Sequence, residues 1–495
     1  MSKEKKSYRN IMKATSVFGG VQVIGIVFKI IGSKFIAIFL GPAGIGVLGL
    51  LNSSISFISS FTNFGIGASS VKNISEATTS SNPEEVDIVA SVIKKIVWFT
   101  GLFGAIFTFS FSSLISKLTF GNVDYKYAFM FLSIVLLINQ LAIGERVLLQ
   151  GLRQIKFLAI SSVLASFVGL IITIPIYYFY RFDGIVTSLV LTSLISLLIT
   201  GYYSRKLKIS KVNLSLKEAF SRGRNMIFMG VMISLGGMLT AGAAYIIRIY
   251  INNIGGAIEV GLFNAGFAIV NTYVGLVFSA MATDYYPRLA AVSKDNSLTK
   301  ETINQQAVIS ILILAPILLV FLIFIKGFIV ILYSTKFLGI SSMIYWAALG
   351  VFFKAISWSI GFVFLSQGKT KIYFWNELLT TFYSLVLNVL GYYYMGLEGL
   401  GISFLLCYFL HMIQVYTVTR FMFNFRLENS LLKIFMIQFC IAVLGFIVTS
   451  YIDSSFKYVL GFILILYSFY FSYKELDKRI DISDIIKNKF KKNEK

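Results

Sequence analysis

The sequence predicts an all-α integral membrane protein with about fourteen transmembrane helices, arranged as two pseudo-symmetric six-helix lobes and two further C-terminal helices. Three observations predict this fold. Hydrophobic residues make up 57% of the 495 residues and charged residues only 13%, about half the charged share of a soluble protein. Apolar runs of roughly 20 residues, long enough to span a bilayer, recur along the whole chain. The chain also resembles itself at an offset near 215 residues.

The apolar runs define the expected helices in order, and no segment between them is long enough to form a soluble domain. We expect no cleavable signal peptide, because the run after the polar start MSKEKKSYRN is too long for a signal sequence and lacks a small-residue cleavage site. The expected spans cover approximately residues 14–40, 45–71, 90–116, 128–150, 157–180, 184–204, 225–252, 259–284, 303–331, 341–366, 371–395, 398–422, 431–451 and 456–473.

The basic residues predict the orientation of these spans. The chain has 44 Lys and Arg against 22 Asp and Glu, which gives a net charge of +22. With the N-terminus in the cytoplasm, most basic residues fall on the cytoplasmic side, and the positive-inside rule then places both termini there. The same charge favours anionic membrane lipids as partners, so nucleic-acid binding is not needed to explain it. The opposite side carries only Lys117, Lys126, Arg181, Lys336 and Lys457.

Three short matches indicate the internal repeat. FDGI at 182–185 corresponds to LEGL at 397–400, QG at 150–151 to QG at 367–368, and IGVL at 45–48 to VGLF at 260–263. Repeats separated by an even number of spans have the same orientation, and transporters built this way hold substrate between their lobes. The predicted domains are an N-terminal lobe at 1–210, a basic cytoplasmic linker at 211–224, a C-terminal lobe at 225–424, two added helices at 425–473 and a basic cytoplasmic tail at 474–495.

Five basic residues lie inside the spans, where a charge costs about 2.5–3.5 kcal/mol on insertion scales. Lys29 and Lys354 lie deep, so we expect them to face a water-filled interior. Lys34 and Arg248 lie within about 6–9 Å of the outer ends of their helices, where snorkelling to the interface explains them as well as function does. Lys326 lies in a long span of uncertain register.

Polar side chains at helical spacing accompany these cations. Lys29 and Ser33 share a face of the first span. Small polar residues are also common in ordinary helix packing, which is the alternative for the serines. Two or three cations in a cavity of low dielectric suit a phosphate or diphosphate. The predicted substrate-binding residues are Lys29, Lys34, Arg248, Lys354, Asn52, Asn63, Asn264 and Asn271.

Few acidic side chains lie inside the spans. Asp284 and Glu377 could titrate in ion coupling, although salt bridges at the inner rim are the favoured alternative. A structural role is also favoured for His411 over a proton relay. The two cysteines, Cys407 and Cys440, indicate packing rather than a disulfide or a metal site. The sequence suggests no cofactor and no metal.

Four stretches resemble the Wzx-type polysaccharide flippases, which transfer O-antigen and enterobacterial common antigen units. They are FLGPAGIGVLGLLNS, FGNVDYKY, AYIIRIYI and DYYPRL. The resemblance covers most of residues 1–424 and extends to a superfamily that includes MATE exporters and lipid II flippases.

The resemblance implies a MATE-like fold in the bacterial inner membrane and a transporter rather than an enzyme. The implied substrate is an undecaprenyl-diphosphate-linked oligosaccharide, moved from the cytoplasmic to the periplasmic leaflet by alternating access. It also implies that Lys29, Lys34 and Arg248 hold the diphosphate, that polymerase machinery is a partner, and that an ion gradient drives transport.

Three other functions remain open from the sequence. A MATE-like exporter of cationic drugs would want carboxylates in its cavity, whereas the charges within the spans are mainly basic. A membrane polymerase or ligase would carry a large outer loop with catalytic residues, and no outer loop here holds an acid–base or metal constellation. A channel is disfavoured because no filter-like motif appears.

Overall fold

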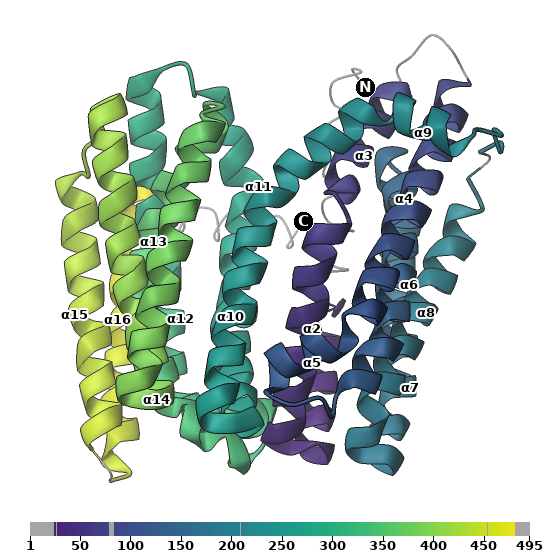
Figure 1. The fold of residues 1–495 in the computed structure, drawn as a ribbon. Helices are drawn as coiled ribbons and strands as arrows, with labels where there is room; N and C mark the ends of the chain where they lie inside the picture. Colours follow the sequence, from purple (N-terminus) through teal and green to yellow (C-terminus); the bar gives the residue numbers. More distant parts are fainter. Residues whose placement is uncertain (1–23, 26, 79–83, 208, 453, 481–495) are drawn as a thin grey trace, which may run out of the picture. The chain divides into compact units, whose positions relative to one another are not determined.

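The computed structural model describes residues 24–25, 27–78, 84–207, 209–452 and 454–480, and every element in them is helical (Figure 1). The predicted all-α membrane fold is confirmed. The elements are α2 (Gly41–Thr62), α3 (Ile66–Ala77), α4 (Glu85–Ser110), α5 (Ser112–Phe120), α6 (Lys126–Gly151), α7 (Ile155–Tyr180), η1 (Arg181–Asp183), α8 (Gly184–Ser204), α9 (Leu216–Arg222), α10 (Arg224–Ala268), η2 (Ile269–Val274), α11 (Gly275–Ala291), α12 (Asn296–Leu332), η3 (Thr335–Ile340), α13 (Ser341–Ser366), α14 (Thr370–Phe423), α15 (Asn429–Tyr451) and α16 (Phe456–Ile480).

Ten helical stretches in the described residues are long and apolar enough to cross a membrane. Three of them, of 50, 68 and 54 residues, are too long for one crossing, because about 20 residues at 1.5 Å each span the hydrocarbon. Each of the three therefore contains two crossings. The helical residues 27–39 belong to the first predicted span, whose beginning lies outside the described residues. The described helices thus agree with about fourteen spans.

The chain divides into two compact units. Unit 1 comprises residues 1–261 and 332–334, and unit 2 comprises residues 262–331 and 335–495. In unit 1, α6 packs against α3, α4 and α8, and α7 packs against α8. In unit 2, α13 packs against α14 and α15, and α15 against α16. The lobe boundaries predicted from the sequence stay a prediction.

Backbone irregularities repeat at a spacing of 215 residues. Positive φ angles occur in three pairs at this spacing, between +50° and +72°, and they mark the ends or breaks of corresponding helices. The pairs are Gly41 with Gly256, Arg153 with Gly368, and Arg181 with Gly396. Since α10 and α14 each bend at their glycine, Gly256 and Gly396 divide them into two crossings.

Matching hydrogen bonds support the same register. The Gln154 amide donates to the Leu149 carbonyl at 2.8 Å, and the Lys369 amide donates to the Phe364 carbonyl at 2.8 Å. The sequence match of the two QG pairs is therefore two residues out of register, because Gly368 corresponds to Arg153 rather than to Gly151. Apolar sequence offers many short chance matches, whereas a left-handed residue has few places to occur.

Two glycines make a reciprocal close contact inside unit 1. A Cβ atom added to Gly46 of α2 would lie 1.8 Å from the Ala257 carbonyl oxygen, and one added to Gly261 of α10 would lie 1.8 Å from the Pro42 carbonyl oxygen. Each residue and its counterpart are again 215 positions apart. Glycine allows membrane helices to approach backbone to backbone. This contact explains why both repeats carry a glycine there.

The two C-terminal helices of unit 2 are joined by polar groups. Gln438 of α15 is fully buried and donates to the hydroxyl of Ser472 at 2.9 Å, while the Ser468 hydroxyl of α16 donates back to Gln438 at 2.7 Å. A buried amide in a bilayer has no water to pair with, so these bonds hold the two helices in one register.

Candidate functional site

Lys354 lies in an aromatic cage within unit 2. Its Nζ atom is 5.6 Å from the ring centre of Phe278, 5.8 Å from that of Phe404 and 5.0 Å from that of Tyr408. It also donates to Oδ1 of Asn271 at 3.5 Å. Lys354 is half-buried, and cation–π contacts of about 0.5–2 kcal/mol each, depending on desolvation, offset part of the cost of removing its charge from water.

The geometry of this cage depends on one irregular turn. Asn271 lies in the π-helix η2, at the junction of α10 and α11, and π-helical turns are common at functional sites.

Lys354 is about 20 Å along α13 from the start of that helix, which is too deep for simple snorkelling. No carboxylate of the described residues forms an ion pair with Lys354. The cage therefore leaves a positive charge available to an anion.

A cavity of about 170 Å³ lies between α13 and the two halves of α14, also in unit 2. Glu377 and His411 both line it. His411 Nδ1 is buried and has no hydrogen-bond partner among the described residues. The Gln414 side chain donates to Oδ1 of Asn376, which also lines the cavity, at 2.7 Å and so joins the two halves of α14. The cavity thus brings together two titratable side chains that were considered separately from the sequence.

In unit 1, the candidate residues lie on the first helix, on α2 and on α10. Lys29 is exposed, and Lys34 and Arg248 are half-buried. Arg248 donates from Nη1 to the Ala244 carbonyl at 2.6 Å. Asn52 is exposed on α2, beside the buried Leu51. The predicted contact of these residues with one substrate stays a prediction.

Two predicted residues have local contacts that explain them structurally. Asn63 accepts a hydrogen bond from the Gly65 amide at 2.8 Å and so closes the turn between α2 and α3. Asp284 is 83% exposed and pairs with Arg288 Nε at 3.6 Å, which is the salt bridge that the sequence analysis favoured. Asn264 is half-buried in α10. The roles of all three in binding or coupling stay predictions.

Sequence reasoning missed the aromatic members of the cage. Phe278 lies in α11 and Phe404 and Tyr408 lie in α14, more than 100 positions further along the chain, and the chain has 47 Phe and 27 Tyr. The four-residue spacing of Phe404 and Tyr408 places them on one helix face. That spacing was the only available signal, and it is common in apolar helices.

Comparison with known proteins identifies the family. The family model for "Polysaccharide biosynthesis protein" matches residues 11–293, which is more than half of the chain. The chain belongs to this polysaccharide biosynthesis protein family. The predicted resemblance to Wzx-type flippases is confirmed by this match and by the curated relatives.

Two relatives show how far the similarity extends. A putative O-antigen transporter of Shigella flexneri is 25% identical over 349 residues, which cover 68% of this chain and 80% of that protein. The lipid III flippase of Escherichia coli (strain K12) is 22% identical over 353 residues, which cover 70% of this chain and 82% of that protein. These relatives are named as transporters and flippases, in agreement with the prediction that the chain is not an enzyme.

Solved structures show the same fold. The lipid II flippase MurJ, in an inward closed conformation, aligns with a TM-score of 0.72 and 13% identity, covering 94% of this chain and 99% of MurJ. An inward-facing MATE multidrug transporter aligns with a TM-score of 0.69 and 14% identity, covering 83% and 96%. The predicted MATE-like fold is therefore confirmed, and the protein is a multi-pass membrane protein.

Proposed function

We propose that this protein is a flippase that moves undecaprenyl-diphosphate-linked oligosaccharide units from the cytoplasmic to the periplasmic leaflet of a bacterial inner membrane. The family match is the main support for this proposal, because it covers residues 11–293. The relatives named as an O-antigen transporter and a lipid III flippase support the same function. The flippase fold supports it. Both termini would lie in the cytoplasm, as the charge bias predicts.

The proposed substrate contacts are cationic. In unit 2, Lys354 with Asn271 would bind a phosphate oxygen, because the cage holds the ammonium group without a paired carboxylate. In unit 1, Lys29, Lys34 and Arg248 would contribute further charge. A lysine offers a point charge, whereas the arginine would offer bidentate geometry to the diphosphate. Asn52, Asn63 and Asn264 would supply hydrogen bonds to the glycan.

Ion coupling is assigned to the cavity beside α13. Glu377 is the better of the two predicted coupling residues, because it lines a cavity together with His411. Asp284 is highly exposed and already paired with Arg288.

We propose two rocking lobes, at 1–210 and 225–424, joined by the linker at 211–224. The helices at 425–473 and the tail at 474–495 follow them, and polymerase machinery would receive the flipped unit.

The test is a lipid extraction from cells that lack the protein, followed by mass spectrometry of undecaprenyl-linked glycans. Accumulation of one complete repeat unit, reversed by the intact gene, is the expected result and names the substrate. Unchanged glycolipids together with greater sensitivity to cationic drugs would contradict the proposal and favour the MATE-like exporter function. The MATE structural similarity makes that exporter the alternative worth measuring.

A further inference from the structure

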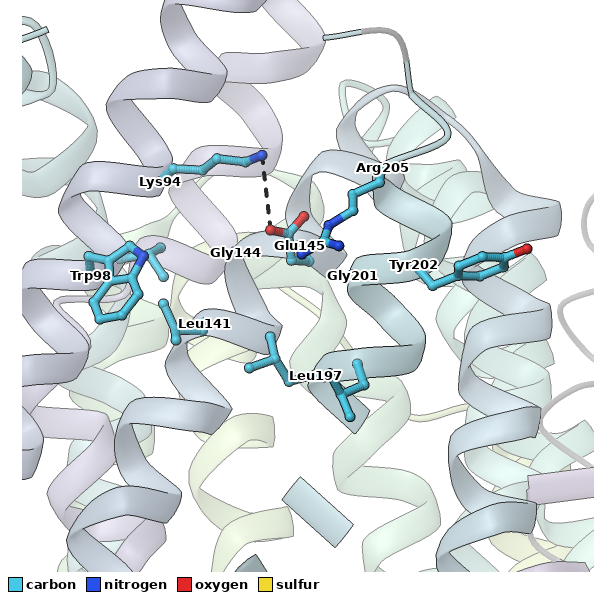
Figure 2. A pocket seen from close by; sticks show the side chains of 11 residues that line it. Lys94, Trp98, Leu141, Gly144, Glu145, Leu197, Gly201, Tyr202 and Arg205 are labelled. Carbon is cyan, nitrogen blue, oxygen red and sulfur yellow. Dashed lines mark ion pairs between the residues drawn. The ribbon is translucent and has the colours of Figure 1, made fainter. Parts of the chain in front are cut away.

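A second cavity, of about 340 Å³, opens on the surface of unit 1 between α4, α6 and α8 (Figure 2). It lies near the start of α4 and near the ends of α6 and α8, and so at one membrane face. Glu145, at its centre, is about 9 Å from the end of α6. None of its lining residues has a role in the proposed function. The polar lining side chains are Lys94, Glu145, Tyr202 and Arg205.

The charges in this cavity are incompletely paired. Lys94 Nζ lies 4.0 Å from Glu145 Oε1, which is an ion pair but not a hydrogen bond. Figure 2 shows Arg205 reaching toward the same carboxylate from the end of α8. Glu145 Oε2 has no hydrogen-bond partner among the described residues. The cavity therefore offers two cationic groups and one carboxylate that lacks a close donor.

The mouth of the cavity is apolar and exposed. Trp98 is 55% exposed, Leu198 62% and Tyr202 59%. Trp and Tyr are typical of the membrane interface, where an amphipathic ring meets the headgroups. Lys206 lies 4.5 Å from the ring centre of Tyr202 and adds positive charge next to the mouth. Charged groups that suit a lipid headgroup and apolar groups that suit an acyl chain thus lie side by side.

We propose that this cavity binds the headgroup of a phospholipid with a phosphodiester and a hydrogen-bond donor. The phosphate would contact Lys94 and Arg205, because a phosphodiester is the anion available at this depth. The donor, an ammonium or a hydroxyl group, would pair with Glu145. An acyl chain would cover Trp98 and Leu198. Phosphatidylethanolamine and phosphatidylglycerol both carry this combination, whereas phosphatidylcholine carries no donor.

This site does not depend on the flippase function. It needs only the membrane location and the local geometry of unit 1, and it is lined by side chains other than those assigned to the transported substrate. A soluble anion such as inorganic phosphate would leave the apolar mouth uncovered, so the geometry points to a lipid.

The test is native mass spectrometry of the full chain in detergent, with equimolar phosphatidylethanolamine, phosphatidylglycerol and phosphatidylcholine of identical acyl chains. We expect retention of either donor-carrying lipid over phosphatidylcholine. Lys94→Ala with Arg205→Gln should reduce that retention, by roughly fivefold for each cation removed. Lys95→Ala is the matched control, because Lys95 is the adjacent lysine of α4 and does not line the cavity.

A further variant distinguishes the two lipids. Glu145→Gln should reduce retention of phosphatidylethanolamine more than that of phosphatidylglycerol, because an ammonium group loses its ion pair with the carboxylate, whereas a hydroxyl group can still donate to the glutamine oxygen. Arg205→Gln alone, at an exposed position with no described partner, provides a variant that should fold normally. Equal retention of phosphatidylcholine, or full retention by a folded double variant, would overturn the proposal.

Discussion

Lys354 is the residue whose surroundings bear most directly on substrate binding. Three aromatic rings and Asn271 surround its ammonium group. Lys354→Ala should reduce transport roughly 10- to 100-fold, since a hydrogen bond to a charged group contributes about 1.5–3 kcal/mol. Lys354→Arg should retain part of the activity. Surface polysaccharide and accumulated lipid-linked glycan measure both, with the exposed Lys326→Ala as control.

Unaltered polysaccharide in Lys354→Ala cells would remove this residue from the transport pathway. The aromatic cage would then only stabilise the half-buried charge of Lys354. Lys354→Met separates the two roles, because it keeps the stem that packs against the rings but removes the charge.

Lys29 tests the cationic contribution of unit 1. It is exposed on the first helix, at a depth where snorkelling is difficult. If it binds the diphosphate, Lys29→Ala should abolish transport at normal expression, and Lys29→Arg should keep some, because the charge is preserved. Polysaccharide content is the measurement, and immunoblotting controls for the amount of protein. Normal surface polysaccharide in the alanine variant would exclude Lys29 from the site.

At the scale of elements, the crossing of α2 and α10 depends on Gly46 and Gly261. Either glycine changed to alanine would press Cβ into a carbonyl oxygen of the other helix. Each change should destabilise the protein by about 1–3 kcal/mol, the usual cost of overpacking. Thermal unfolding in detergent measures the loss.

Gly237→Ala is the control for these glycines. It lies in the same helix, α10, and a Cβ atom added there would meet no atom within 4 Å, so its change should be neutral or slightly stabilising. Equal melting temperatures for all three variants would show that the two helices do not cross through these glycines.

The short helix α9 depends on a capping box. The Ser215 hydroxyl accepts from the Glu218 amide at 3.1 Å, and the Glu218 carboxylate accepts from the Ser215 amide at 2.6 Å. These bonds lower the pKa of Glu218. Because the folded pKa is lowered, the stabilisation is present above the ordinary glutamate pKa and is lost as the pH falls through the lowered value.

Hydrogen exchange of the α9 amides measures this dependence. Protection of these amides, expressed relative to intrinsic exchange at the same pH, should fall at acidic pH in the unaltered protein, and Ser215→Ala should lower it already at neutral pH. Rates in Ser215→Ala that match the unaltered protein would show that the cap does not hold α9.

At the scale of the whole molecule, hydropathy predicted more of the structure than residue patterns did, while the orientation that the charges predict stays a prediction. The number of crossings follows from apolar length, which the bilayer fixes. The repeat was also predicted, although its register at QG was two residues out. The partners of Lys354 could not be predicted, because they depend on a π-helical turn and on helices far apart in the chain. Likewise, the sequence spacing of Glu377 and His411 does not predict that they line one cavity, because only the bend of α14 at Gly396 brings them together.

Orientation is the property of the whole molecule on which the other proposals depend. In a background with Cys407→Ser and Cys440→Ser, single cysteines at the exposed positions Ser210 and Ser454 would face opposite sides. A membrane-impermeant maleimide should label Ser454→Cys in intact spheroplasts and Ser210→Cys only after lysis, because basic loops remain in the cytoplasm. The reverse pattern would invert the predicted topology.

The same labelling assigns the leaflet of the lipid cavity. Arg205 lines that cavity and is five residues from Ser210, so both lie at the same membrane face. A cytoplasmic Ser210 would place the cavity in the inner leaflet, from which the proposed substrate also enters. The cavity of unit 1 would then bind phospholipid from the leaflet in which the proposed substrate is loaded. Lys354 of unit 2 would remain available to the transported diphosphate.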